Sequence, residues 1–222
     1  MKSIRRICRL LFVSFGPFQH HNQDPLDTLI RTILSQNTAD LNSGRAFQNL
    51  KAAFPTWKEA RRAPRQSIEK AIACAGLSKR KSLYIRQVIT ALSDSRGKPS
   101  LARIRKMETR QAREFLFSLP GVGMKTASCV LLFALGRPVC PVDTHVLRVA
   151  KRLGAIPPDS TAEKATPALE AIVPPDCMLA FHLGLIQVGR TVCRPQRPRH
   201  EDCLLRDLCD FAAESGRKTG RK

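Results

Sequence analysis

The sequence predicts an all-α protein, and three observations support this fold class. Apolar residues recur with the three- and four-residue spacing of amphipathic helices along most of the chain. Gly and Pro separate these stretches, and no stretch shows the strict alternation typical of a half-buried strand. A chain of 222 residues, 43% of them hydrophobic, can bury a sizeable core as one large domain or two small ones.

The expected helices follow one another in chain order. The first is basic, and we interpret it as a docked amphipathic helix rather than a targeting leader, because its apolar residues share one face. Asp24 and Pro25 have the residue types of a helix cap and first turn, and this second helix ends near the stretch SQNTAD. Further helices are expected at 46–54, 57–60, 67–73, 81–92, 127–135 and 176–189, and one more ends at Leu119. A capping box is expected at 160–163.

The charge balance indicates a polyanionic partner. The chain has 38 Lys and Arg against 18 Asp and Glu, a formal net charge of +20, which favours nucleic acid. Because only 5% of the residues are aromatic, few rings are available to stack on single-stranded bases, so we expect a duplex. No run approaches the roughly 18 apolar residues of a membrane span. We therefore expect no membrane partner. We also expect a monomeric, cytoplasmic protein without a targeting signal, associated with the nucleoid if the polyanionic partner is DNA.

The stretch LPGVGMKTA, residues 119–127, predicts a tight hairpin between two helices. Pro120 ends one helix, and Gly121 and Gly123 permit a turn with positive backbone angles and leave the backbone open to close approach. The amides here, together with the first amides of the next helix, can bind a phosphate oxygen. A simple helix-to-helix turn is the alternative. In a chain of this charge we expect a contact with the backbone of a nucleic-acid duplex, made by Gly121, Val122, Gly123 and Met124.

Lys125 falls in the first turn of the following helix, where the helix dipole disfavours a cation. Pairing with a phosphate is one explanation. The other is that an amine at this place, partly withdrawn from water, is favoured in its uncharged form and acts as a nucleophile.

The stretch FLFSLPGVGMKTASCVLLFALGRPVCPVDTHVLRVAKRLG resembles the helix-hairpin-helix DNA glycosylases of the endonuclease III family. With ILSQNTAD upstream and a cysteine-rich end downstream, the resemblance covers nearly the whole chain. It implies a bifunctional DNA N-glycosylase/AP lyase of base excision repair, acting on double-stranded DNA with damaged (oxidised) pyrimidines or abasic sites. Lys125 would attack the sugar of a flipped nucleotide, form a Schiff base and promote β-elimination, and Asp143 would stabilise positive charge on the sugar. Asp143 could equally cap its helix, and the two roles are compatible.

The resemblance also implies residues that fill the gap left by the extruded base. The matching positions are Asn37, where the family commonly has glutamine, and Leu77. An ordinary core or helix-end position is the alternative for Leu77. His145 is a possible phosphate or wedge contact, and the arginines of the cysteine-rich end are expected against the DNA backbone: Arg194, Arg197 and Arg199.

The cysteine-rich end departs from the family pattern at one position. The family has C-x6-C-x2-C-x5-C around an iron–sulfur cluster, and this chain has Cys193, His200, Cys203 and Cys209, with histidine at the second position. Imidazole can replace thiolate on iron, so we favour a 4Fe–4S cluster with Cys3His ligation. Zinc is a strong rival, because Cys3His is a common structural zinc set. A vestigial site without a cluster, with His200 merely solvated, is the third possibility.

The resemblance implies two helical lobes. We expect a helix-hairpin-helix bundle at 25–137, and a second domain that joins 1–24 to 138–222 and carries the metal loop at 193–209. Two rival functions stay open. A thymine or uracil mismatch glycosylase would share most of these features, and a catalytically silent DNA-binding module would use the hairpin and the metal loop only as grips. An adenine-mismatch enzyme is disfavoured, because residues 28–39 contain no acid and Lys125 is present.

Overall fold

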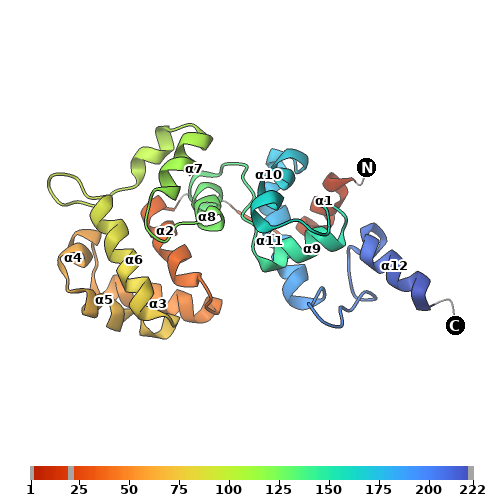
Figure 1. Cartoon of the computed structure of the whole chain (residues 1–222), viewed down its shortest axis with the longest axis horizontal. Coiled ribbons are helices and arrows are strands. Elements are labelled where there is room, and N and C mark those ends of the chain that lie inside the picture. Colours follow the sequence, from red (N-terminus) through yellow and green to blue (C-terminus); the bar gives the residue numbers. More distant parts are fainter. Residues whose placement is uncertain (1–2, 20–22, 220–222) are drawn as a thin grey trace. The chain divides into compact units, whose positions relative to one another are not determined.

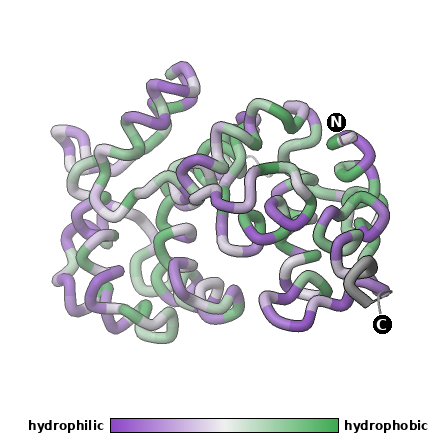
Figure 2. Tube along the Cα trace, turned by 45° about the vertical axis from the view of Figure 1, so that its right-hand side comes forward, coloured by the Kyte–Doolittle hydropathy of each residue, from purple (hydrophilic) through white to green (hydrophobic). Residues whose placement is uncertain are grey.

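The computed structural model describes residues 3–19 and 23–219, and these residues form helices joined by short loops (Figure 1). Within them there is no strand, only an isolated antiparallel bridge between Ser93 and Pro99. The all-α prediction is therefore confirmed. The internal contacts divide the chain into two compact units, one spanning His21–Gly136 and the other Met1–His20 with Arg137–Lys222. In Figure 2, hydrophobic and hydrophilic residues alternate in short runs along the helices, as amphipathic helices require.

The unit His21–Gly136 is built around two buried helices, α2 (Pro25–Ser35) and α8 (Met124–Leu135), which pack against each other. Asp24 caps α2 as expected, since its carboxylate accepts the backbone N–H groups of Leu26 and Asp27. α8 is apolar along most of its length and ends at Gly136, whose φ of +65° is the left-handed conformation typical of a helix end. The other helices of this unit are α3 (Asp40–Ala53), α4 (Trp57–Arg62), α5 (Arg65–Ala71), α6 (Ser78–Ala91) and α7 (Thr109–Phe117), with short 3-10 turns at Ala73–Ala75 and Ala102–Lys106.

The second unit has the helix α11 (Met178–Thr191) at its centre. α11 packs against α9 (Thr144–Arg152) and against the N-terminal helix α1 (Ile4–Phe15). The contact with α1 is close: a Cβ added at Gly184 would lie 2.7 Å from the Leu11 Cβ. The amphipathic first helix is therefore docked, as the sequence predicts. The unit also contains α10 (Ala162–Ile172), α12 (Asp210–Thr219) and 3-10 turns at Pro175–Cys177 and Arg206–Leu208.

The capping box expected at 160–163 is wrong by one residue. The N-cap of α10 is Thr161, whose hydroxyl accepts the Lys164 N–H. Ser160 instead closes the preceding turn, donating its backbone N–H to the Pro157 carbonyl, and it is buried. The helix expected at 176–189 begins at Met178, because Pro175–Cys177 forms a 3-10 turn before it.

No single helix in the described part of the chain is both long and apolar enough to cross a membrane. One pair, Ala162–Ile172 with Pro175–Thr191, would be long enough only together, and it bends by 119°.

Candidate active site and metal loop

The predicted hairpin lies between α7 and α8, and its backbone is shaped by two glycines. Gly121 has a φ of +74°, and a Cβ added there would lie 2.6 Å from the Tyr84 ring of α6, so both its conformation and its surroundings require glycine. Gly123 has open space around it and is the N-cap of α8, with no side-chain hydrogen bond to the first turn. The first N–H groups of α8 are therefore available to an anion.

Lys125 is the second residue of α8 and is half-buried. Among the described residues of its own unit, no hydrogen bond or ion pair engages its amine. The sequence predicts this lysine at the positive end of a helix dipole, and α8 does begin at Met124, directly before Lys125.

Gln36 supports the hairpin from α2, and sequence reasoning missed it. Its side-chain amide lies 3.3 Å from the Gly121 carbonyl and 3.3 Å from the Thr126 hydroxyl, so it connects the end of α2 to both sides of the turn. Within SQNTAD, the family resemblance indicates the neighbouring Asn37 instead. The only signal for Gln36 was a second amide beside the first.

Asn37 and Leu77 share an unusual backbone conformation. Their φ angles are +50° and +49°, in the left-handed region that residues other than glycine rarely adopt. Such a conformation costs about 1–3 kcal/mol and is concentrated at functional sites. Leu77 is 58% exposed, so the core interpretation is wrong, and it is the N-cap of α6. Among the described residues, the third one of this kind is Arg197, with a φ of +48°.

Asp143 is the N-cap of α9, and its Oδ1 accepts the Val146 N–H at 2.8 Å. The capping role is therefore confirmed, and one carboxylate oxygen is committed to it. Asp143 belongs to the second unit, whereas Lys125 belongs to the unit His21–Gly136.

α9 is tied to the cysteine-rich segment through arginines. His145 lies 3.1 Å from Arg148 through its Nδ1, and the Arg148 guanidinium donates to the carbonyls of Cys193 (2.9 Å) and Gly189 (2.8 Å). Arg152, one turn further along, donates to the Cys193 sulfur at 3.3 Å and to the Arg194 carbonyl at 2.7 Å. These contacts fix the start of the cysteine-rich segment against α9.

The four predicted ligands, Cys193, His200, Cys203 and Cys209, line one small cavity of about 20 Å³. Burial raises the pKa of the Cys203 thiol, and the nearby Cys193 and Cys209 add to this effect. The donor set is therefore of the chemical type that holds an iron–sulfur cluster or zinc. Within the described ranges, however, no three His, Cys, Asp or Glu side chains are arranged as ligands of a metal ion.

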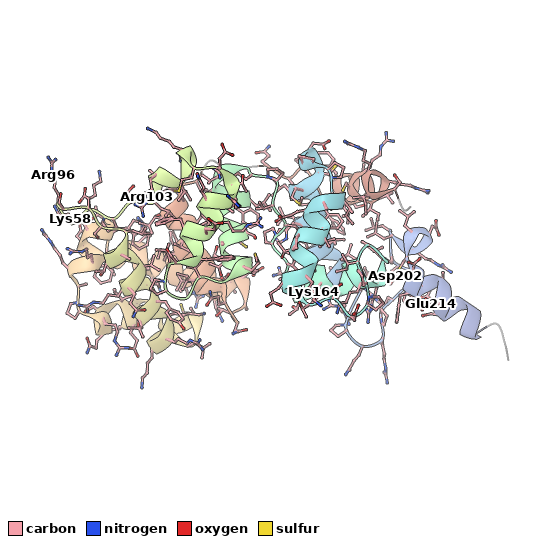
Figure 3. The ribbon with its side chains drawn as sticks, turned by 45° about the horizontal axis from the view of Figure 1, so that its top comes forward. Lys58, Arg96, Arg103, Lys164, Asp202 and Glu214 are labelled. Carbon is pink, nitrogen blue, oxygen red and sulfur yellow. The ribbon has the colours of Figure 1, made fainter. Side chains whose placement is uncertain are left out.

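The basic side chains of the metal loop are exposed. Arg194, Arg197 and Arg199 all lie at the surface of their unit, and Arg199 also pairs with Asp202 at 3.4 Å. In the other unit, Figure 3 shows the labelled side chains of Lys58 and Arg96 pointing away from the ribbon, while the exposed Arg103 lies over the Phe115 ring. These basic side chains therefore lie on the surfaces of their units.

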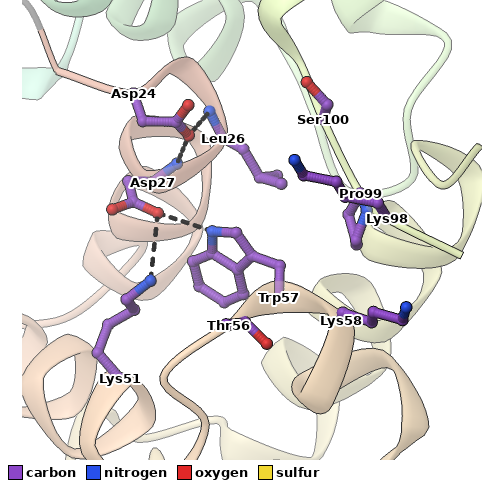
Figure 4. A pocket seen from close by; sticks show the side chains of 10 residues that line it. All are labelled: Asp24, Leu26, Asp27, Lys51, Thr56, Trp57, Lys58, Lys98, Pro99 and Ser100. Atoms are coloured by element: carbon purple, nitrogen blue, oxygen red, sulfur yellow. Dashed lines mark hydrogen bonds and ion pairs between the residues drawn. The ribbon is translucent and has the colours of Figure 1, made fainter.

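A pocket of about 580 Å³ lies where α2 begins, at the helix end away from Gln36 (Figure 4). On its wall, Asp27 accepts the Trp57 Nε1–H at 2.7 Å and pairs with Lys51 at 3.8 Å. Lys51 also lies 4.7 Å from the centre of the Trp57 ring. These contacts join α2, α3 and α4, and none of the predicted site residues lines this pocket.

Comparisons with known proteins agree with this arrangement. The family model described as HhH-GPD superfamily base excision DNA repair protein matches residues 30–175. The chain is 39% identical over 195 residues to a candidate DNA glycosylase of Arabidopsis thaliana, covering 84% of this chain and 67% of the relative. It is 32% identical over 201 residues to the endonuclease III of Thermotoga maritima, covering 90% of each.

A solved structure described as a trapped endonuclease III–DNA covalent intermediate superposes with a TM-score of 0.76 at 28% identity, covering 97% of this chain and 100% of that one. The resemblance seen in the sequence is thereby confirmed. The chain belongs to the endonuclease III family of helix-hairpin-helix base excision repair proteins and is a DNA glycosylase.

Proposed function

We propose that this DNA glycosylase is bifunctional: it excises damaged pyrimidines from double-stranded DNA and then cleaves the strand at the abasic site, with Lys125 as nucleophile. The observation that carries the proposal is the position of Lys125, in the first turn of α8 directly after the glycine hairpin and without a partner in its own unit. The hairpin amides would hold the DNA backbone beside this amine. The covalent DNA complex described for an endonuclease III of the same fold supports the same chemistry.

The proposed reaction begins with attack of the Lys125 amine on C1′, the anomeric carbon of the sugar. The Lys125 nitrogen donates its lone pair to C1′, and the bond between C1′ and the base nitrogen breaks. The base leaves with the electrons of the broken bond and takes up a proton. The C1′–O4′ bond of the sugar then breaks, O4′ keeps its electron pair and takes up the proton that the amine releases, and a Schiff base remains. Loss of a C2′ proton follows, and the 3′ phosphate departs with the electrons of its C3′–O bond. Asp143 would stabilise the positive charge that develops on the sugar, using the carboxylate oxygen that does not cap α9.

The remaining predicted residues would hold and open the duplex. The amides from Gly121 to Met124, together with His145, Arg194, Arg197 and Arg199, would contact phosphates, which carry no sequence information. Asn37 and Leu77 would fill the space of the everted nucleotide, a role that their exposed positions and left-handed backbones support.

The cysteine-rich loop would hold a 4Fe–4S cluster through Cys193, His200, Cys203 and Cys209. A bound cluster would supply a fixed structural crosslink for a basic loop and take no part in the bond changes at the sugar. The hydrogen bond from Arg152 to the Cys193 sulfur supports this assignment, because metal-bound thiolates commonly accept such bonds. Zinc and an empty loop are the outcomes that would correct it.

A strand-cleavage assay tests the proposal. The substrates are duplexes that contain an oxidised pyrimidine, a thymine or uracil mismatch, or a preformed abasic site. We expect excision and cleavage at the oxidised pyrimidine, and loss of both in Lys125→Ala. Lys58→Ala removes the same charge from an exposed surface and should retain activity. Activity confined to the mismatches would favour the rival glycosylase, and DNA binding without any cleavage would favour the silent module.

A further inference from the structure

Lys81 is a buried lysine that the mechanism above does not use. It lies in the first turn of α6 with only 2% of its surface exposed. Its amine donates to the Leu34 carbonyl at 2.7 Å, to the Ala75 carbonyl at 3.0 Å and to the Thr38 hydroxyl. All three acceptors are neutral, and no ion pair to Lys81 is found in the described ranges.

The three acceptors belong to two separate segments. Leu34 and Thr38 lie on either side of Asn37, at the end of α2 and in the loop that follows. Ala75 lies two residues before Leu77. The Thr38 hydroxyl is also within hydrogen-bond distance of the Ala75 carbonyl. One amine therefore joins the loop that carries Asn37 to the loop that carries Leu77.

This arrangement is not explained by stability alone. Withdrawing an ammonium group from water is unfavourable, and burial lowers the pKa of Lys81 accordingly. An apolar side chain of the same length would fill the space without that cost, but it could not hold three acceptors in fixed directions. What the lysine adds is the relative position of the two loops, both of which have an exposed residue with a left-handed backbone.

We propose that Lys81 is a positioning residue that fixes Asn37 and Leu77 relative to each other, so that both enter the duplex together when the target nucleotide is everted. The inference rests on the proposed roles of these two residues. Lys81 does not touch the reacting atoms. Its loss slows eversion and leaves the chemical steps at Lys125 unchanged.

The test compares a damaged pyrimidine paired in a duplex with the same base inside an unpaired bubble, under single-turnover conditions. In the bubble no base pair has to be broken, so the wedge, that is the inserted side chains of Asn37 and Leu77, matters less. Lys81→Met should slow excision from the paired duplex by about tenfold or more, the loss expected for hydrogen bonds to a charged group, and from the bubble by less than about threefold. Lys79→Met is the matched control, because Lys79 is an exposed lysine of the same helical turn.

A second measurement follows the opening of the base stack by Asn37 and Leu77. A 2-aminopurine placed next to the lesion becomes fluorescent when the stack opens, and Lys81→Met should reduce this signal. Leu77→Ala should do the same, and the double variant should lose less than the sum of the two single losses, because both act on one element. Thr38→Val removes one acceptor of the amine and serves as the second variant if Lys81→Met does not fold.

The outcomes separate the two proposals. Equal losses of Lys81→Met on paired and bubble substrates, or additive losses with Leu77→Ala, would overturn the positioning role. If Leu77→Ala and Asn37→Ala leave eversion unchanged, the proposed wedge itself is wrong. A wild-type protein inactive on both substrates would instead contradict the proposed activity.

Discussion

Tyr84 packs its ring against Gly121, at the point where the hairpin turns between α7 and α8. A Cβ at Gly121 would lie 2.6 Å from this ring, and the Arg80 Nε–H donates a 2.9 Å hydrogen bond to the Tyr84 hydroxyl. The hairpin is thus shaped from outside as well as by its own glycines. This contact belongs to tertiary structure, so the sequence of the hairpin alone does not reveal it.

Gly121→Ala should destabilise the protein and weaken DNA binding together. The substitution meets the Tyr84 ring and places alanine at a φ of +74°, so we expect a loss of about 1–3 kcal/mol in the free energy of unfolding. Gly123→Ala is the matched control, because a Cβ there meets nothing within 4 Å. It should leave stability within about 0.5 kcal/mol and still weaken DNA binding by hindering backbone approach. Urea unfolding and a fluorescence-anisotropy titration measure both, and equal destabilisation by the two alanines would contradict this account.

Asp143→Asn should separate the two roles of this residue. Asparagine can still accept the Val146 N–H, so the cap and the stability should be retained. The charge is lost, so single-turnover excision should fall by about 100-fold or more while the Kd for DNA changes by less than about threefold. Asp143→Ala should in addition lose about 1 kcal/mol of stability with the cap. Equal losses of turnover and affinity in Asp143→Asn would remove its assigned role.

If the metal loop holds the proposed 4Fe–4S cluster, the purified protein should be coloured. Purified without oxygen, the chain should be brown, and it should contain about four iron and four sulfide per chain if the cluster is 4Fe–4S. His200→Cys should retain the cluster, and His200→Ala should lose it more readily. Removal of the metal should lower the melting temperature and DNA affinity, because Cys193 and Cys209 contact Arg152 of α9. A colourless protein with stoichiometric zinc would identify the rival metal.

Stability should fall at alkaline pH through Cys8. Burial, reinforced by the neighbouring Cys177, raises the pKa of this thiol from 9.0 to about 12. Between these values the unfolded chain loses the proton while the folded chain keeps it, so stability is fully present below pH 9.0 and decreases as the pH rises towards 12. Cys8→Ala should flatten this decrease by up to about 1.4 kcal/mol per pH unit in reduced protein. An unchanged slope between about pH 9 and 10 in urea unfolding would contradict the shift.

Local sequence patterns predicted most of the helices, because caps and apolar periodicity are properties of neighbouring residues. Asp24 with Pro25, the apolar run of α8 and the amphipathic α1 are examples. The capping box failed where tertiary structure intervened: Ser160 has the right residue type, but the turn after Pro157 buries it, and Thr161 caps α10 instead. α12 was not expected, because its residues are mostly polar and lack a long apolar stripe.

The residues of the candidate site also fall into those that local motifs predict and those that only tertiary contacts reveal. Motifs indicated the hairpin, Lys125 and the four predicted metal ligands, which are among the residues that line the small cavity. The residues that hold the site together, Gln36, Tyr84 and Lys81, were not found, because each acts across the fold on a segment more than 30 residues away. Because lysine is rarely buried, a sequence alone predicts that a lysine such as Lys81 is exposed.

Borohydride trapping tests the central claim most directly. The wild-type chain is incubated with a duplex that contains an oxidised pyrimidine and is reduced during turnover, and the covalent complex is digested and mapped by mass spectrometry. We expect one DNA-derived adduct, on the peptide that contains Lys125, and no adduct in Lys125→Ala under the same conditions, while Lys58→Ala is trapped as the wild type is. An adduct on another lysine, or efficient base release with no trapped complex at all, would contradict the assignment of Lys125 as the nucleophile.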